Sequence, residues 1–230
     1  MENFELRLST PQTYAQAAFD KLEKGILSGF FQPGQQLNER DLSVKLGISR
    51  TPLREALRKL ERDGLVTAKP HRGWEVRRFS YREVAEIYAV QARLESMSAR
   101  LAAEEGDVSL VEELEEILIS ARAFHSVRDL SKLWEANKSF HMKIIHGSNN
   151  TVLINLVTKL RSQVSYLWSI PLLDSERFIK HLSEHEAIVK YIAEANGPAA
   201  EELLYTHLRQ ASDATIRILR QQSSSGESEQ

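Results

Sequence analysis

Three histidines and one asparagine in the second half of the chain have types and spacings suited to holding a metal ion. Asn137 and His141 are four residues apart, which places them on one face of a predicted helix. In an antiparallel helical hairpin turning at Gly197, His185 and His207 would lie roughly 18 and 15 Å from the turn, at about 1.5 Å per residue. At nearly equal heights, these two imidazoles can share one ligand. Three imidazoles with an oxygen donor suit a divalent transition metal.

Other interpretations of these side chains stay open. Histidines are often hydrogen-bonded structural residues, and in a pocket without metal they would hydrogen-bond a small ligand directly. His181 and His185 also form an i, i+4 pair, which is a competing constellation. The aromatic residues Trp134, Tyr166 and Trp168 could line a pocket, although aromatic residues at helical spacing also form cores.

A second set of residues has the chemistry of nucleic-acid recognition. Arg50, Thr51, Arg54 and Arg58 share the outward face of a predicted helix that begins after Ser49. A guanidinium can pair bidentately with guanine in the major groove, and free N–H groups in the first turn of a helix favour phosphate. Arg58 could equally be a solvated surface residue. An aliphatic core, to which this helix contributes its opposite face, would hold the helix against its neighbours; its residues are Leu42, Leu46, Ile48, Leu53, Ala56, Leu57 and Leu60.

Caps and breaks predict the elements that position this helix. Thr10, followed by proline, is a candidate N-cap for the first helix. Asn38 is a good N-cap for the second, and Gly47 suits the left-handed residue that ends it. This order of helices, with a two-stranded wing after them, is that of a winged helix-turn-helix. The predicted helices cover residues 11–28, 38–46 and 49–64, and the predicted strands cover 65–68 and 74–79.

From Ser80 onward the pattern is entirely helical. Ser80 with Glu83, and Ser109 with Glu112, have the spacing of a capping box. We therefore expect a mainly α protein, with a winged helix-turn-helix over 1–79, an all-helical bundle over 80–222 and a disordered Ser- and Glu-rich tail over 223–230. The predicted helices of the bundle are 81–105, 110–125, 129–146, 151–169, 174–196 and 198–221.

Charge divides the chain in the same way. Residues 1–79 hold 14 Lys and Arg against 10 Asp and Glu, whereas residues 80–230 hold 16 against 22, within a total net charge of −2. A basic module joined to an acidic domain favours a nucleic-acid partner for the first part. The absence of cysteine excludes disulfides, thiolate zinc clusters and cysteine nucleophiles. No secretory signal and no membrane-spanning run is evident, so we expect a cytoplasmic protein without a membrane partner.

The stretch PGQQLNERDLSVKLGISRTPLREALRKLERDGLV, followed by HRGWEV, resembles the DNA-binding domain of the GntR family of bacterial regulators. The resemblance covers roughly residues 12–79. It implies that Arg50 and Arg54 contact bases, and that Arg40, Ser49 and Thr51 suit phosphate. The residues that would contact DNA by this resemblance, wing included, are Arg40, Ser49, Arg50, Thr51, Arg54, His71, Arg72 and Gly73.

The helical part, residues 81–221, resembles the FCD effector domain of the FadR-type branch of that family. The segments NKSFHMKIIHGSNN and SEHEAIVKYIAEAN, with the later His207, fall where the family has an acid and three histidines as metal ligands. The resemblance thus implies a divalent transition metal of the Zn, Ni or Mn class and an effector that is a small carboxylate. Carried over residue by residue, the ligands would be Asn137, His141, His185 and His207.

The sequence departs from the family pattern at two places. Asn137 stands where the family commonly has aspartate, and a neutral amide oxygen is a weaker metal donor than a carboxylate. Gln91 stands where an arginine is frequent, four residues before Glu95, so an effector carboxylate could meet Arg93 instead. Gln91 and Arg93 are therefore the candidate effector-binding residues.

These features predict a homodimeric transcription regulator, more a repressor than an activator, that binds a near-palindromic operator on double-stranded DNA. The effector would act by binding one of two states of the protein more tightly. A metal-free acyl-ligand sensor of the FadR type is the main alternative. A metal-dependent enzyme is a third possibility, but no convincing general base accompanies the histidines, and we expect no enzymatic activity.

Overall fold

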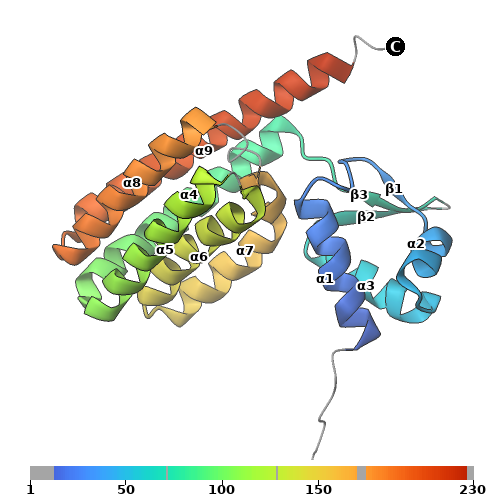
Figure 1. Ribbon diagram of the computed structural model, residues 1–230, viewed down its shortest axis with the longest axis horizontal. Helices are drawn as coiled ribbons and strands as arrows, with labels where there is room; N and C mark the ends of the chain where they lie inside the picture. The colour runs from blue at the N-terminus through green and yellow to red at the C-terminus, as the bar shows by residue number, and fades with distance from the viewer. Residues whose placement is uncertain (1–12, 71, 128, 170–174, 227–230) are drawn as a thin grey trace, which may run out of the picture. The chain divides into compact units, whose positions relative to one another are not determined.

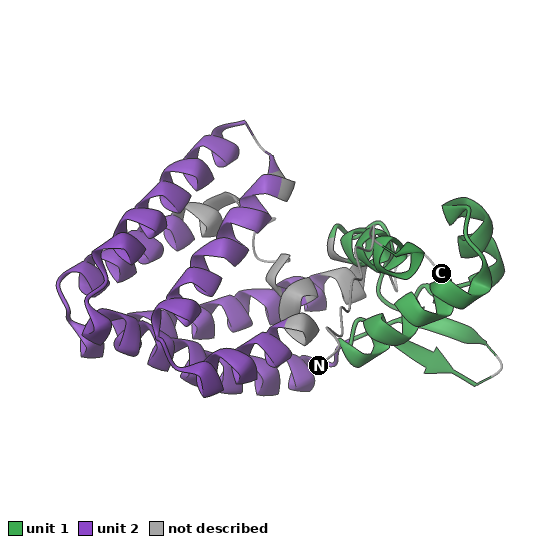
Figure 2. Ribbon diagram, turned by 90° about the horizontal axis from the view of Figure 1, so that it is seen from below, with its two compact units in different colours: residues 1–78 green, residues 79–230 purple. Residues whose placement is uncertain are grey.

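The computed structural model describes residues 13–70, 72–127, 129–169 and 175–226. The chain divides into two compact units, residues 1–78 and 79–230, which Figure 2 shows in two colours. The sequence places its domain boundary near residue 79.

In the residues that the structure describes, the first unit combines three helices with a small antiparallel sheet (Figure 1). The sheet has the strand order β1-β3-β2, in which Trp74 of β3 pairs with Leu37 of β1 and with Ala68 of β2. Strand β1 was not predicted, because two residues after a Pro-Gly turn are too few to show an alternating pattern. The elements are α1 (Tyr14–Leu27), β1 (Gln36–Leu37), α2 (Glu39–Leu46), α3 (Arg50–Arg62), β2 (Val66–Lys69) and β3 (Gly73–Val76).

Helix α1 packs on α3 and α2 packs beside α3, so α3 is held from two sides. Most of the aliphatic face predicted for α3 is buried, with Leu53, Leu57 and Leu60 fully inaccessible. Leu46 and Ile48, at the turn between α2 and α3, are only half-buried and contribute less to this core than expected. The packing leaves the other face of α3 at the surface.

The second helix begins and ends as predicted. The side chain of Asn38 accepts hydrogen bonds from the backbone N–H groups of Arg40 and Asp41, and Gly47 ends α2 with a left-handed φ of 66°. The first helix starts later than expected, because its N-cap is Thr13, whose side chain accepts from Gln16 N. The predicted cap, Thr10, lies outside the described residues.

The second unit is helical throughout the part of it that the structure describes (Figure 1). Helix α4 packs along α9, α5 packs on α6, and α8 packs on both α5 and α9. None of the described helices is long and apolar enough to cross a membrane. The elements are α4 (Tyr81–Glu105), α5 (Val108–Ser126), α6 (Leu130–Gly147), α7 (Thr151–Ser169), α8 (Ser175–Ala193) and α9 (Gly197–Gly226).

The caps of the bundle were predicted in part. Ser80 and Glu83 form the expected capping box at the start of α4. The second expected box, at Ser109, is wrong. Helix α5 begins two residues earlier, and Asp107 caps it by accepting from Ser109 N, because a carboxylate directly after the left-handed Gly106 is already in place to do so. Helix α9 also runs on to Gly226, past the start of the expected tail.

Candidate metal centre and candidate DNA interface

Three histidines that are distant in the sequence meet inside the second unit. His141 comes from α6, His185 from α8 and His207 from α9, and each is at most 5% exposed. One ligand nitrogen from each lies within 4.8 Å of the others. The Nε2 atoms of His185 and His207 are 3.2 Å apart, so the two imidazoles do lie at the same height on neighbouring helices. Two imidazole nitrogens that share one Zn²⁺ at about 2.0–2.1 Å would have a similar separation.

A carboxylate lies next to Nδ1 of two of these imidazoles. Oε2 of Glu184 lies 2.7 Å from Nδ1 of His207, and Oε2 of Glu95 lies 3.1 Å from Nδ1 of His141. An ionised carboxylate only accepts hydrogen bonds, so the contact with Glu184 favours the proton on Nδ1 of His207 and a free electron pair on its Nε2. Metal-binding histidines are commonly oriented in this way. The ring of His185 is held differently, stacked on the buried ring of Phe140 at 4.0 Å between centroids.

The charge state of the site also suits a cation. Burial lowers the pKa of His141 to about 4, against the opposing effect of Glu95, so this imidazole is neutral at pH 7. Burial alone would raise the pKa of Glu95, but the charge of Arg161 and contacts with His141 and Gln91 lower it below its ordinary value. Burial lowers the pKa of Arg161 to about 10, which leaves it cationic at pH 7. Neutral imidazoles oriented by carboxylates are the form that binds divalent metals.

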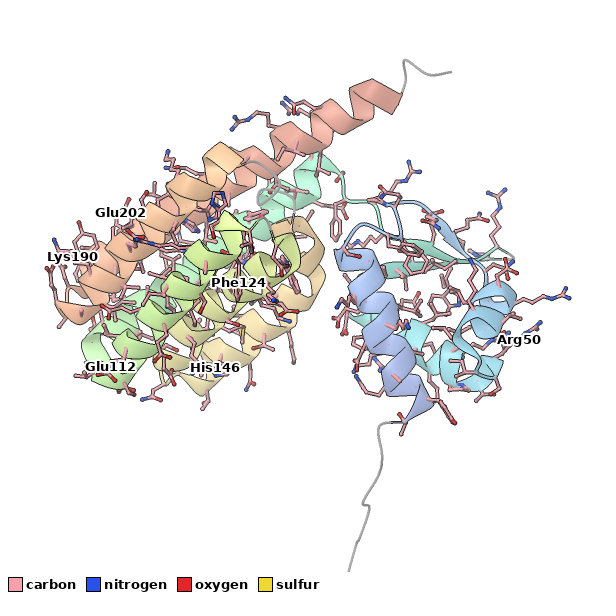
Figure 3. The ribbon with its side chains drawn as sticks, in the orientation of Figure 1. Arg50, Glu112, Phe124, His146, Lys190 and Glu202 are labelled. Atoms are coloured by element: carbon pink, nitrogen blue, oxygen red, sulfur yellow. The ribbon has the colours of Figure 1, made fainter. Side chains whose placement is uncertain are left out.

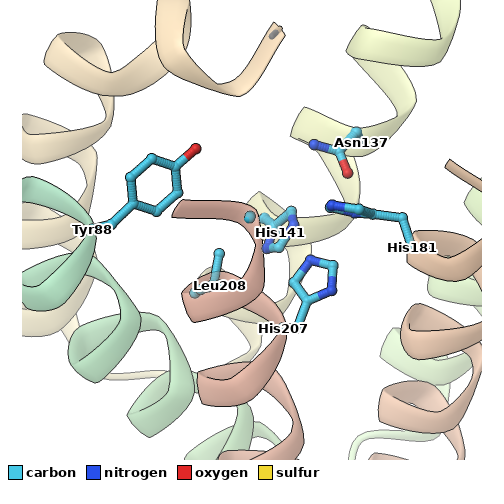
Figure 4. Close-up of a pocket in the computed structure, with 7 residues that line it drawn as sticks. Tyr88, Asn137, His141, His181, His207 and Leu208 are labelled. Atoms are coloured by element: carbon cyan, nitrogen blue, oxygen red, sulfur yellow. The ribbon is translucent and has the colours of Figure 1, made fainter. Parts of the chain in front are cut away.

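Asn137 lies one turn before His141 and faces the same hollow. Figure 4 shows this hollow, with Asn137 and His181 opposite Tyr88 and with His141 and His207 between them. His181 is 5% exposed, and its ring lies 4.3 Å from that of His207. The residues that line the hollow are Tyr88, Asn137, His141, His181, His207, Leu208 and Ala211. The donor set expected from the sequence therefore converges on one place and fits a transition metal.

The two candidate effector residues lie in different surroundings. Gln91 is buried, and its Nε2 donates to Oε1 of Glu95 at 2.7 Å. It therefore contacts the same carboxylate that lies next to His141. Arg93 is exposed, and its guanidinium lies 3.9 Å from the ring centroid of Tyr205, so it does not line the hollow in Figure 4. Contact of either residue with an effector stays a prediction.

Of the aromatic residues that could line a pocket, Trp134 is half-buried and packs against the cluster of Ala121, Leu133 and Ala136. The side chains of Tyr166 and Trp168 lie outside the described residues. Trp134 thus follows the expectation that aromatic residues at helical spacing form cores.

Sequence reasoning missed Glu95 and Glu184 as partners of the histidines. Glu95 carried a usable signal, because it falls on the buried stripe of α4 between Tyr88, Ala92 and Ala99, where a charge needs a partner. Glu184 carried none, since it precedes His185 in the sequence but contacts His207 on the next helix.

The predicted DNA-contacting residues of α3 lie at its exposed start. Ser49, Arg50, Thr51 and Arg54 are all exposed, and Arg50 extends from the surface of the first unit (Figure 3). The Ser49 side chain makes no cap hydrogen bond, although Ser49 is the N-cap residue of α3. Arg58 is also exposed. A helix start with exposed guanidinium and hydroxyl groups has the composition needed to enter a major groove.

Arg40 at the start of α2 is exposed, and so are Arg72 and Gly73 in the wing. Gly73 begins β3 with a left-handed φ of 79°, which lets the wing turn tightly there. His71 lies outside the described residues. In the sequence these positions lie before and after α3, in the order that the resemblance requires, and their contact with DNA stays a prediction.

One residue that the sequence did not single out connects three elements of the first unit. Glu39, in the first turn of α2, accepts a hydrogen bond from Arg54 Nε of α3 at 2.8 Å and another from Trp74 Nε1 of β3 at 3.1 Å. Burial raises the pKa of Glu39, but the hydrogen bonds from Trp74 and Arg54 outweigh this effect and hold it below its ordinary value. Glu39 therefore stays ionised between two donors at neutral pH.

Comparison with known proteins gives a family match for each of the two units. The family "Bacterial regulatory proteins, gntR family" matches residues 14–76, and the FCD domain matches residues 86–210. The chain is 30% identical over 208 residues to the uncharacterized HTH-type transcriptional regulator YdhC of Bacillus subtilis (strain 168), covering 90% of this chain and 92% of YdhC. It is 26% identical over 229 residues to the HTH-type transcriptional repressor RspR of Escherichia coli (strain K12), covering 98% and 99% of the two chains.

Among solved structures, that of E. coli McbR/YncC has the same fold, with a TM-score of 0.76 at 22% identity over 92% of this chain and 99% of that one. The fold and these relatives define a DNA-binding transcription regulator. The chain belongs to the GntR family, and an FCD domain follows its winged helix-turn-helix in the sequence. Its relatives are regulators and not enzymes, so the enzyme alternative is set aside.

Proposed function

We propose that this protein is a homodimeric repressor whose affinity for a near-palindromic operator is controlled by a small carboxylate effector bound at a metal ion in the helical unit. The observation that carries the proposal is the convergence of His141, His185 and His207, two of them backed by carboxylates, in a chain that also has exposed arginines at the start of α3. Cytoplasmic localisation follows from a DNA partner.

The ion would be held by the three imidazoles and by the amide oxygen of Asn137, which lines the same hollow. Imidazole nitrogens favour a transition metal of the Zn, Ni or Mn class over Ca²⁺ or Mg²⁺, which prefer oxygen ligands. When bound, such an ion supplies a coordination position that a carboxylate oxygen can occupy. The chain itself contributes the orientation of the donors through Glu95 and Glu184.

In the first unit, Arg50 and Arg54 would contact bases, while Arg40, Ser49 and Thr51 would contact phosphates and position the helix. The wing residues His71, Arg72 and Gly73 would also contact DNA. A dimer would place two such helices on the two halves of the operator. In such a dimer, Val90 and Met97, which are 54% and 42% exposed and lie two turns apart on α4, would be candidate interface residues. The effector would change operator affinity by a coupling free energy, typically about 1–3 kcal/mol.

The decisive experiment combines metal analysis of the purified protein with fluorescence-anisotropy titration of its own upstream DNA. We expect close to one transition-metal ion per chain, and an operator affinity that falls when the correct organic acid is added to the metal-loaded protein. A metal-free acyl-ligand sensor predicts the contrary: no bound metal after purification without chelator, and a response to acyl ligands that EDTA leaves unchanged.

A further inference from the structure

A fourth imidazole, that of His181, lies beside the three that the sequence predicts as metal ligands. His181 precedes His185 by one turn of α8 and is only 5% exposed. Its ring centroid lies 4.3 Å from that of His207 and 5.6 Å from that of His185. It lines the same hollow as His141, and in Figure 4 its ring points into the space between Asn137 and His207. Four imidazoles and one amide therefore gather at the histidine site.

The position of His181 in α8 suits a ligand of the same ion as His185. Residues four apart lie on one face of a helix, with about 5–6 Å between their Cβ atoms. Two histidines at this spacing are a recurrent pair of zinc ligands on a single helix. The nitrogens of His181 lie outside the group of ligand atoms within 4.8 Å of one another that the other three imidazoles form. Its ring therefore has to turn about the side-chain bonds to join them.

Asn137 makes a further nitrogen donor significant. Its amide oxygen is neutral and a weaker metal donor than the carboxylate that the family commonly has at this position. Asn137 and His181 line both of the hollows that meet at the histidine site, so the imidazole stands next to the weak oxygen donor. Imidazole ligands suit Zn²⁺ and Ni²⁺, whereas carboxylate, carbonyl and water ligands suit Mn²⁺. The change from carboxylate to amide and the added imidazole favour the same group of metals.

We propose that His181 is a fourth imidazole ligand and that, with the neutral Asn137, it makes the site selective for Zn²⁺ or Ni²⁺ over Mn²⁺. This inference rests on the proposed function and narrows the class of metal that its site accepts. Helix α8 then supplies two ligands from adjacent turns, while α6 and α9 supply one imidazole each.

The test compares the full-length protein with its variant His181→Phe, which keeps a flat aromatic ring at this position but removes both nitrogens. We expect zinc affinity, measured by competition with a fluorescent chelator, to fall by about 100-fold, the upper end of what a residue outside the coordination sphere contributes. In the protein loaded with Co²⁺ as a spectroscopic substitute for Zn²⁺, the visible absorption bands should shift, because their energies depend on the ligands. His146→Ala, which removes an exposed histidine of α6, should change neither result.

The Co²⁺ spectrum separates coordination from packing. If His181 only packs against His207, its replacement can change metal affinity without changing the ligands. An unshifted spectrum in His181→Phe would therefore overturn the inference, whatever the change in affinity. If the variant does not fold, X-ray absorption spectroscopy of the zinc-loaded unmodified protein still counts the imidazole ligands. Four are expected, and three would contradict the inference.

Metal selectivity gives an independent result. Asn137→Asp combined with His181→Phe produces a donor set of one carboxylate and three imidazoles, so we expect the preference for Zn²⁺ over Mn²⁺ to be weaker than in the unmodified protein. An equal preference in both proteins would refute the role of these two residues in metal choice.

Failure of this inference differs from failure of the proposed function. If the unmodified protein binds zinc through three imidazoles, the inference falls and the proposed function stands. If it binds none of Zn²⁺, Ni²⁺ and Mn²⁺, both fall.

Discussion

Nε of Arg54 lies 2.8 Å from Oε2 of Glu39, and this contact joins the helix expected to enter the DNA groove to the helix before it. Arg54 is 57% exposed in its side chain, and its Nε is the atom that Glu39 binds. The two terminal Nη groups, which form the edge that pairs bidentately with guanine, are therefore not needed for this contact. The second oxygen of Glu39 accepts from Trp74 in the wing strand, so the carboxylate orients the guanidinium from a fixed position.

Removing the guanidinium tests its role in base recognition. We expect Arg54→Ala to lower affinity for the operator by about 1–3 kcal/mol, because one bidentate contact with guanine is lost, and to weaken binding to unrelated DNA much less. Fluorescence anisotropy with both duplexes measures the difference. Arg82→Ala is the control, since Arg82 lies in the second unit and is 88% exposed in a pair with Glu86. Unchanged operator affinity in Arg54→Ala would refute the assignment.

Glu39→Gln tests whether the carboxylate positions Arg54. The amide oxygen can still accept one of the two hydrogen bonds but carries no charge, so we expect a partial loss of operator affinity, smaller than that of Arg54→Ala. In the double variant Glu39→Gln, Arg54→Ala, the loss should equal that of Arg54→Ala alone, because Glu39 acts through the guanidinium. Additive losses would show that Glu39 contributes to binding independently. Glu75→Gln in the wing is a matched control, since Glu75 pairs only loosely with Lys69 at 3.8 Å.

His185→Ala combined with His207→Ala removes two of the three imidazoles proposed as ligands from the sequence, and we expect the double variant to be purified without transition metal. The physical reason is that fewer than the four usual ligands remain, and none of them is charged. Inductively coupled plasma mass spectrometry gives the metal content directly. His146→Ala is the control, since His146 is on the same helix as His141 but exposed. Equal metal content in the double variant and the parent would eliminate the site.

Glu184→Gln tests the orientation of His207 without removing a ligand. Partners of metal-binding histidines typically contribute about 10- to 100-fold in metal affinity, and we expect a loss in that range. Competition with a fluorescent chelator measures it. Glu186→Gln is the matched control two residues along, because Glu186 pairs with the exposed Arg122 and not with a histidine. A loss of the same size in both variants would indicate a general effect of charge and not orientation of His207.

Asn137→Asp restores the carboxylate that the family commonly has at this position. A charged oxygen is a stronger donor than an amide oxygen, so we expect the variant to keep its metal longer against EDTA and to unfold at a higher temperature when metal is present. Differential scanning fluorimetry with and without EDTA follows both effects. An unchanged rate of metal loss would mean that residue 137 is not a ligand.

Much of the fold was predictable because its signals are local. Asn38, Gly47 and the Ser80–Glu83 box set helix ends through contacts within a few residues, and the structure has them as expected. The predictions failed where two local signals competed or where an element was too short. Asp107 took the cap expected of Ser109, and β1 consists of only two residues, which pair with β3.

The sequence by itself determined which residues can share a helix face, and hence that α3 presents arginines at its start and that His185 and His207 lie level across a turn. Helical periodicity and rise fix these relations within one helix or one hairpin. Only the tertiary structure decided which faces of different helices meet. It placed Glu39 against Arg54, Glu95 against His141 and Glu184 against His207, because the packing of whole apolar faces sets those distances and no local rule does.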